Sequence, residues 1–568
     1  MKARGLYILA ALMAVLFLSS CGSQANCPVC GTTKNGTYGI INIIPVPEHN
    51  PTGEPGGPFN SFDISVIDSV GHRDYVSDRI GLTVDVIDTV NNVSVNTIGG
   101  ANAVAQAGNN ASPCIPTIPF LVSAVGNPTR FGCRTLNFSA NGFGANGLFG
   151  GFPGAQCCAS RGNGVNPLSS PNGEVLTPDG LTLFSGNASS TVIVFDLTTN
   201  PPTVIAAIPT GQSADWDGPN GVSPCIASAS GLAFSSPTCG DLRADEMAYD
   251  AKDQILLVTN GDPGFPFATL IDVSAVVNRT GNCLPVNPSL PYSSTNFPTC
   301  IIGQIYYDGA PLNNGNVAVD NQTAAGFPCP DPSVAAPSGV SGTGVGAGGA
   351  NVPCHHGPIV TNAGVFCNQT SPAANCSGAI SPAGLGAAAF NPNTGHFLLP
   401  NSNATPDLTI GTIDEVDPRI GNPNGPIVVN TFVTPNCMPG SIVQGLGNQF
   451  LVGCADHDGV AFPPNEIVID GTAGTILANI PYVGGVDEIW FNPGDNRYYV
   501  AARDMPTGPV LGVIDATDNT WLQNAATNTN SHSVAADSSN NHIFVPMQAG
   551  SPCTTQSANG CIAVYAQQ

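Results

Sequence analysis

The sequence has few charged side chains, and basic ones are the scarcest. Of its 568 residues, 14 are Lys or Arg and 38 are Asp or Glu, which makes the formal net charge −24 and only 9% of the residues charged. A nucleic-acid-binding protein needs a basic surface to meet the phosphates, and attraction to anionic lipids needs clustered Lys or Arg. The composition therefore excludes both classes. Because 42% of the residues are apolar, the chain is also not an acidic disordered tail.

Several familiar signatures are missing as well. The sequence contains no Gly-x-Ser-x-Gly elbow and no Gly-Lys dipeptide, which removes the usual evidence for a serine hydrolase and excludes a P-loop. Beyond the N-terminus, no stretch reaches 18 uninterrupted apolar residues, so no further membrane-spanning helix is expected.

The N-terminus carries an export signal. Two basic residues precede an apolar run, and the run ends in Leu-Ser-Ser-Cys at Cys21, the pattern of a secretory signal peptide. The cleavage region resembles the bacterial lipobox, so we predict a lipoprotein signal peptide over 1–20, a lipidated Cys21 and a tether over 21–35. Gly22 after the cysteine implies, in such lipoproteins, the outer membrane or cell surface. A plain signal peptide with a chance cysteine is the alternative.

A repeat dominates the rest of the chain. Each copy contains a strand pattern, a tight turn, a second strand, a longer loop, a third strand, an Asp-containing turn and a fourth strand, over about 40–45 residues. Seven copies begin near Phe62, Pro171, Asp245, Leu385, Pro439, Asp487 and His532. This period predicts an all-β, seven-bladed β-propeller over 36–568. The last copy lacks its fourth strand, and we expect residues 37–46 to supply it and close the ring.

The copies resemble the YVTN-type propeller repeat of bacterial surface and periplasmic proteins. PNGEVLTPDGLTLFSGN, followed by TVIVFDL, is the most similar copy, and the resemblance covers about 36–100, 171–308 and 384–568. Other copies are similar to a functionally undefined subgroup whose fifth blade opens with Cys…Pro-His-Gly. Here Cys437-Met438-Pro439-Gly440 lacks that His. The resemblance implies a propeller fold and a surface location, and no activity.

In a propeller, the blade-to-blade connections and the loops between second and third strands share one face. This assigns three long insertions, 101–169, 212–244 and 309–383, to one side of the ring. Without Cys21, 18 cysteines remain, an even number that favours disulfides in an oxidising compartment. We predict that local disulfides cross-link the loops of this face. Three pairs are favoured: Cys437–Cys454, Cys225–Cys239 and Cys553–Cys561. On the opposite face, the repeated third-strand Asp is expected to cap a turn.

The first residues of the inner strands should ring the central opening on the loop-rich face. The candidate ligand-binding residues are Asp63, Asn172, Asp245, Glu246, Asp487, Glu488 and His532. Two Asp-Glu pairs and a histidine suit a divalent cation such as calcium, or a cationic or polyol ligand. The metal-ligand candidates are Glu246, Glu488 and His532. Two alternatives remain: Arg243 and Arg503 fold over the mouth as counter-charges, or the polar residues simply bond to neighbouring blades.

Two functions follow from these observations. The first is a non-catalytic, lipid-anchored propeller that binds a protein, glycan or small molecule through its loop-rich face. The second is a metal-dependent hydrolase or lactonase in the central funnel, with Asp245 or Asp487 as general base. The sequence favours the first, because it contains no catalytic motif and the second rests on analogy between folds.

Overall fold

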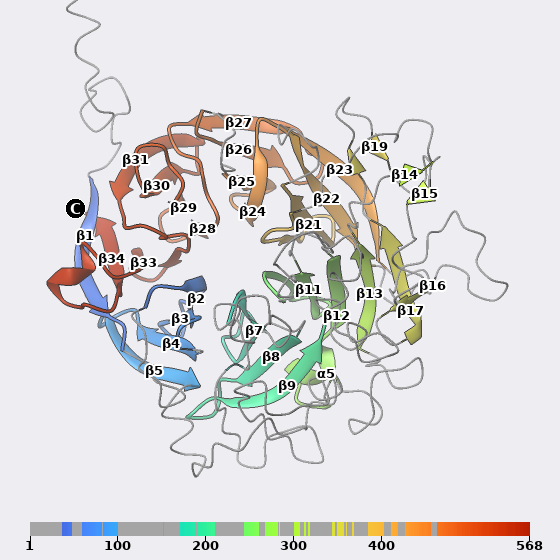
Figure 1. The fold of residues 1–568 in the computed structure, drawn as a ribbon, viewed down its shortest axis with the longest axis horizontal. Helices are drawn as coiled ribbons and strands as arrows, with labels where there is room; N and C mark the ends of the chain where they lie inside the picture. The colour runs from blue at the N-terminus through green and yellow to red at the C-terminus, as the bar shows by residue number, and fades with distance from the viewer. Residues whose placement is uncertain are drawn as a thin grey trace, which may run out of the picture.

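A computed structural model of the chain shows a closed ring of seven β-sheets (Figure 1), and residues of the inner strands line a channel at its centre. The structure describes residues 37–47, 59–99 without 82, 152, 171–210 without 188–190, 244–260, 267–281, 283 and 300–306. It further describes short strands between 312 and 367, and residues 384–402, 410–418, 426–455 and 463–568. The seven-bladed all-β prediction is confirmed. No helix in these ranges is long and apolar enough to cross a membrane.

The first three complete blades are formed in chain order from four strands each. The first has β2 (Phe62–Asp68), β3 (Arg73–Asp78), β4 (Thr83–Asp88) and β5 (Val93–Gly99). The second has β6 (Glu174–Leu176), β7 (Thr182–Asn187), β8 (Thr191–Asp196) and β9 (Thr203–Pro209). The third has β10 (Met247–Asp250), β11 (Ile255–Asn260), β12 (Phe267–Asp272) and β13 (Ile301–Tyr306), with helix α5 (Ser274–Val277) after β12.

The next three blades repeat this order. The fourth has β20 (Ala389–Asn391), β21 (His396–Asn401), β22 (Ile410–Asp417) and β23 (Ile427–Pro435). The fifth has β24 (Met438–Gln444), β25 (Gln449–Ala455), β26 (Asn465–Asp470) and β27 (Ile476–Pro481). The sixth has β28 (Ile489–Asn492), β29 (Arg497–Ala502), β30 (Val510–Asp515) and β31 (Thr520–Ala526).

Short strands lie within the stretch predicted as the third insertion. They are β14 (Leu312–Asn313), β15 (Asn316–Val317), β16 (Thr343–Gly346), β17 (Gly349–His356), β18 (Ile359–Val360) and β19 (Phe366–Cys367). β17 pairs in parallel with the outer strand β13, and β16 pairs with β17. The third blade is therefore widened at its outer edge by part of this stretch.

The seventh blade joins the two ends of the chain, as predicted. It contains β32 (Ala535–Asp537), β33 (His542–Met547), β34 (Cys561–Gln567) and, outermost, β1 (Tyr38–Pro45), with the 3-10 turn η6 (Cys553–Thr555) between β33 and β34. β1 pairs antiparallel with β34 from Tyr38–Gln567 to Pro45–Cys561. Gln523 of the sixth blade accepts a hydrogen bond from the Tyr38 amide (2.8 Å) and donates one to its carbonyl (2.9 Å). These contacts tie the closing strand to both neighbours.

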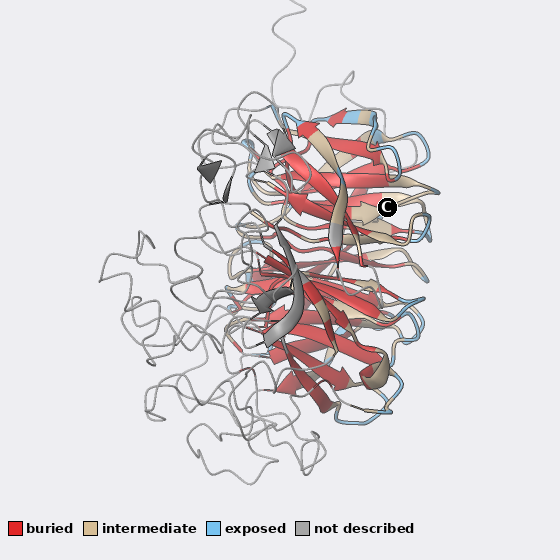
Figure 2. Cartoon of the chain, turned by 90° about the vertical axis from the view of Figure 1, so that its right-hand side faces the viewer, coloured by how far each residue is buried: buried red, intermediate tan, exposed pale blue. Residues whose placement is uncertain are grey.

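Buried side chains run through every blade, whereas the exposed described residues gather at the turns (Figure 2). The middle strands have both faces covered by adjacent blades, so they are apolar almost throughout, as in β11, where all six residues are buried. Because each blade packs against two others, the core is a ring of clusters between blades. Phe152, from within the first predicted insertion, packs against Phe195 at a ring-centroid distance of 6.0 Å.

The ring has two different faces. We call the face with Asp63, Asp245 and Asp487 the mouth face; inner strands begin there, and outer strands end there. The other is the turn face, where in five blades the Asp at the end of the third strand accepts a backbone hydrogen bond from the residue two positions on, as predicted. The Asp residues that do so are Asp88, Asp196, Asp272, Asp470 and Asp515.

The three predicted insertions lie almost wholly outside the described residues, but the strands that flank them are described. β5, β9 and β13 end at the mouth face, and β6, β10 and β20 begin there. The long connections therefore leave and rejoin the ring on the mouth face. Conversely, β1 starts at the turn face, because Tyr38 pairs with Gln567 at the end of a third strand.

Two of the three predicted disulfides are present. Cys437–Cys454 and Cys553–Cys561 have Cα separations of 4.9 and 5.4 Å and lie at the mouth face, while Cys225–Cys239 lies outside the described residues. A third bridge, Cys283–Cys300, has a Cα separation of 5.7 Å and joins the third strand of its blade to the fourth at the turn face. Its pairing was not predicted.

Candidate functional site

Three of the predicted mouth residues meet around one arginine. Arg79, which directly follows β3, forms an ion pair with Asp63, and its Nη2 lies 4.0 Å from Oδ1 of Asp245. Its Nε donates a hydrogen bond of 3.1 Å to Oδ1 of Asn172. The arginine thus joins the first three blades and supplies a positive charge between two carboxylates that would otherwise repel each other.

A second arginine serves the opposite side of the mouth. Arg503, which directly follows β29, places Nη1 at 2.8 Å from Oδ2 of Asp487. This confirms Arg503 as a counter-charge, whereas Arg243 lies outside the described residues. Arg79 was missed by the sequence reasoning. It could have been found, because Arg79 and Arg503 hold the same position in their blades, immediately after the second strand.

His532 lies at the mouth but turns toward the first blade. Its Nε2 is 3.5 Å from Oδ1 of Asp63, its Nδ1 is 2.8 Å from the carbonyl oxygen of Asn530, and its ring stacks on Phe62 at 5.1 Å. Its backbone carbonyl accepts a hydrogen bond of 3.2 Å from the Glu488 amide. The backbone of His532 is therefore beside Glu488, as expected, but the ring faces a different carboxylate.

Glu246 and Glu488 face each other from opposite sides of the channel. The two carboxyl groups lie close enough to affect each other's protonation. Burial raises the pKa of both groups, and neighbouring carboxylates raise it further; Glu488 has the largest charge effect on Glu246. Oε2 of Glu246 and Oε1 of Glu488 are buried and accept no hydrogen bond from a donor in the described part of the chain.

No side chain covers Glu246 from the adjacent position of the second blade, because that position is Gly173. Gly173 occupies the same repeat position in the second blade, and its amide donates a 2.8 Å hydrogen bond to the carbonyl oxygen of Asp245. A Cβ at Gly173 would lie 2.0 Å from that oxygen. Only glycine fits, so the position next to Glu246 contributes no side chain.

The three metal-ligand candidates do not form one ligand set. His532 contacts Asp63 instead of the glutamate pair, and the described ranges contain no group of three or more His, Cys, Asp or Glu side chains arranged to hold a metal ion. The structure brings Glu246 and Glu488 near each other but directs the His532 ring to Asp63, and metal binding by these candidates stays a prediction. Sequence position placed the backbone of His532 correctly, but the Phe62 ring and Asp63 determine where the side chain lies.

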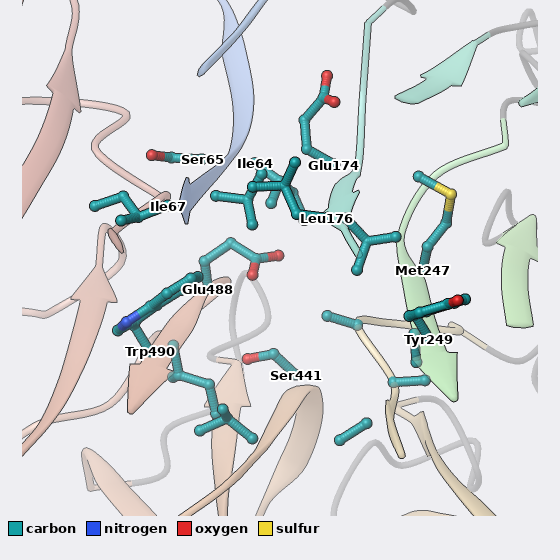
Figure 3. Close-up of a pocket in the computed structure, with 18 of the residues that line it drawn as sticks. Ile64, Ser65, Ile67, Glu174, Leu176, Met247, Tyr249, Ser441, Glu488 and Trp490 are labelled. Carbon is teal, nitrogen blue, oxygen red and sulfur yellow. The ribbon is translucent and has the colours of Figure 1, made fainter. Parts of the chain in front are cut away.

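Behind Glu488, the channel widens into a cavity of about 510 Å³ (Figure 3). The carboxyl of Glu488 projects into this cavity, while that of Glu174 points away and accepts hydrogen bonds from Ser77 and Ser185. Apolar side chains surround the space and are only half-buried although they lie at the centre of the ring. They include Ile64, Leu176, Tyr249 and Trp490.

The cavity reaches the turn face. Its lining extends to Ser69 and Val70 in the first blade and to Pro178 in the second, all in tight turns. Val70 is 83% exposed. Among the described residues that line the cavity, none is an aspartate of the mouth ring. The channel therefore has a carboxyl-rich end near the mouth face and an apolar body that opens on the turn face.

Comparison with known proteins adds no family to this description. No protein-family model matches the chain, and no curated protein matches it either. The fold and the site geometry are therefore the basis for any functional assignment.

Proposed function

We propose that the protein is a non-catalytic binding protein of the bacterial cell envelope, of the YVTN propeller type, anchored through lipid on Cys21. Its partner or ligand binds at the mouth face. One observation carries this proposal: the connections after β5, β9 and β13 leave from the same face that holds Asp63, Asp245 and Asp487. Long connections on a rigid scaffold are where proteins place binding residues.

The position of β1 supports this orientation. The chain enters the ring at Tyr38, on the turn face, so a tether from Cys21 would approach from that side. Sixteen or so extended residues span at most about 55 Å. An anchored propeller would then direct its turn face to the membrane and its mouth face away from it, where a partner can reach the long connections.

The chemistry of the mouth limits the partner. Three carboxylates (Asp63, Asp245 and Asp487) meet two arginines there, and the whole chain carries a net charge of −24. A partner that binds this face must tolerate negative potential, which favours cationic or hydroxyl-rich surfaces and disfavours nucleic acids.

Site-specific photo-crosslinking in living cells tests the proposal. A photoreactive amino acid at Thr507, exposed beside Arg503 on the mouth face, should give discrete adducts, and the same amino acid at Val70 on the turn face should not. Adducts from Val70 alone, or from neither position, would contradict binding at the mouth face. Labelled palmitate should be incorporated into the wild type and not into Cys21→Ala. A mature wild-type protein without acylation would refute the proposed lipid anchor.

Metal-dependent hydrolysis is a second candidate with one observation in its favour. Glu246 and Glu488, two of the three expected ligands, lie close enough in the channel to affect each other's protonation. Elemental analysis of the dialysed protein separates the candidates: a hydrolase of this type requires a stoichiometric divalent ion such as calcium, together with a lower melting temperature in chelator. A metal-free protein with an unchanged melting temperature would eliminate it.

A further inference from the structure

We propose that the central channel binds an organic cation with an apolar chain, with the cationic group at Glu488 and Glu246 and the chain in the cavity behind them. This site is separate from the mouth face and does not depend on the function proposed above. Three features of the channel carry the inference.

The first feature is an unsatisfied acid at the end of the cavity. Glu488 is 8% exposed, projects into the cavity and leaves its buried Oε1 without a donor among the described residues (Figure 3). Glu246 adds a second buried oxygen in the same condition. An ammonium group brings a positive charge and three N–H donors, so it supplies what both oxygens lack.

The second feature is the shape and polarity of the space. The volume of about 510 Å³ falls in the range of small-molecule sites. The stretch from Glu174 to Pro178, all of which lines the cavity, spans about 13 Å, and this length matches an alkyl chain rather than a bare ion. Ile64, Leu176 and Trp490 surround the space, and transfer of an apolar chain from water to such walls is favourable.

The third feature is selectivity by charge. The counter-charges Arg79 and Arg503 point to Asp63, Asp245 and Asp487 at the mouth. Glu174 also lines the cavity, but its carboxyl points away from it and accepts hydrogen bonds from Ser77 and Ser185 on Oε1. An anionic chain would place its carboxylate against Glu488 and be repelled, so the site distinguishes amines from fatty acids.

Calorimetric titration of the full chain with n-octylammonium, n-octanol and n-octanoate tests the proposal. We expect n-octylammonium to bind at least about tenfold more tightly than n-octanol, because a hydrogen bond to a charged partner exceeds a neutral one by that factor. n-Octanoate should not bind. Equal affinity for the amine and the carboxylate, or no binding of the amine, would overturn the proposal.

Two variants and one control locate the binding. Glu488→Gln should weaken n-octylammonium about tenfold or more and leave n-octanol unchanged, while Ala389→Leu, which fills the cavity, should weaken both. Glu466→Gln is the control, because Glu466 is also fully buried with an unpartnered oxygen but lies on β26, outside the channel. Amine binding that survives Ala389→Leu would place the amine elsewhere and refute the site. If Glu488→Gln does not fold, the affinities of the wild type for the three probes and the effect of Ala389→Leu on them still test the proposal.

Discussion

The strand that closes the ring can be tested with two substitutions on the same strand. Ile44 is 1% exposed, pairs with Ile562 of β34 and packs in one cluster with Phe62 and Val564. Ile41 on the same strand is 44% exposed. Ile44→Ala removes buried carbon and leaves a cavity, which costs about 2–5 kcal/mol of unfolding free energy. Ile41→Ala should change it by about 0.5 kcal/mol or less.

Urea unfolding followed by circular dichroism, with the disulfides intact, measures both variants. We expect Ile44→Ala to lower the unfolding free energy clearly more than Ile41→Ala does, because β1 is part of the seventh blade and Ile44 packs in its core. Equal effects of the two substitutions, or no effect of either, would mean that residues 38–45 do not close the ring in solution.

Three further predictions concern the interior and the mouth. Replacement of both Cys437 and Cys454 by Ser should cost about 3 kcal/mol, since the bridge closes a loop with a sequence separation of 17; unchanged urea stability would refute it. Burial raises the pKa of Asp74 to about 7, so its proton is held more tightly in the folded state and stability falls as pH rises from about 4 to 7. Asp74→Asn should therefore gain roughly 3 kcal/mol more at pH 8 than at pH 5 relative to wild type, and a pH-independent difference would contradict this. Arg79→Met should cost about 3 kcal/mol by leaving carboxylates without a counter-charge, and Asp63→Asn in the same chain should restore part of it; a double variant no more stable than Arg79→Met would refute the pairing.

The ring could be predicted because the same strand-and-turn pattern recurs in each blade. Middle strands such as β11 are buried on both sides and are apolar without alternation, and the third strands of five blades end in an Asp that caps the turn. The missing fourth strand of the last copy indicated that the N-terminal run closes the ring. The same reasoning placed Cys437 and Cys454 at neighbouring strand ends, within bridging range.

The site was only partly predictable, because it depends on side-chain direction and channel width. The repeat placed Glu246 and Glu488 on opposite sides, but how near their carboxyl groups come depends on how far the seven inner strands lie from the axis. Arg79 was missed because only the starts of inner strands were considered, whereas it follows a second strand. The cavity is lined both by small side chains such as Ala389 and by the large Trp490, and the repeat pattern of the sequence does not predict that combination.

A crystal structure of the full chain with n-octylammonium tests the central claim most directly. The account predicts the alkyl chain between Leu176 and Trp490 and the ammonium nitrogen within hydrogen-bond distance of Glu488 and Glu246. A cavity filled by ordered water with the glutamate pair unchanged, or the amine bound at the mouth aspartates instead, would contradict the assignment of the channel as a site for organic cations.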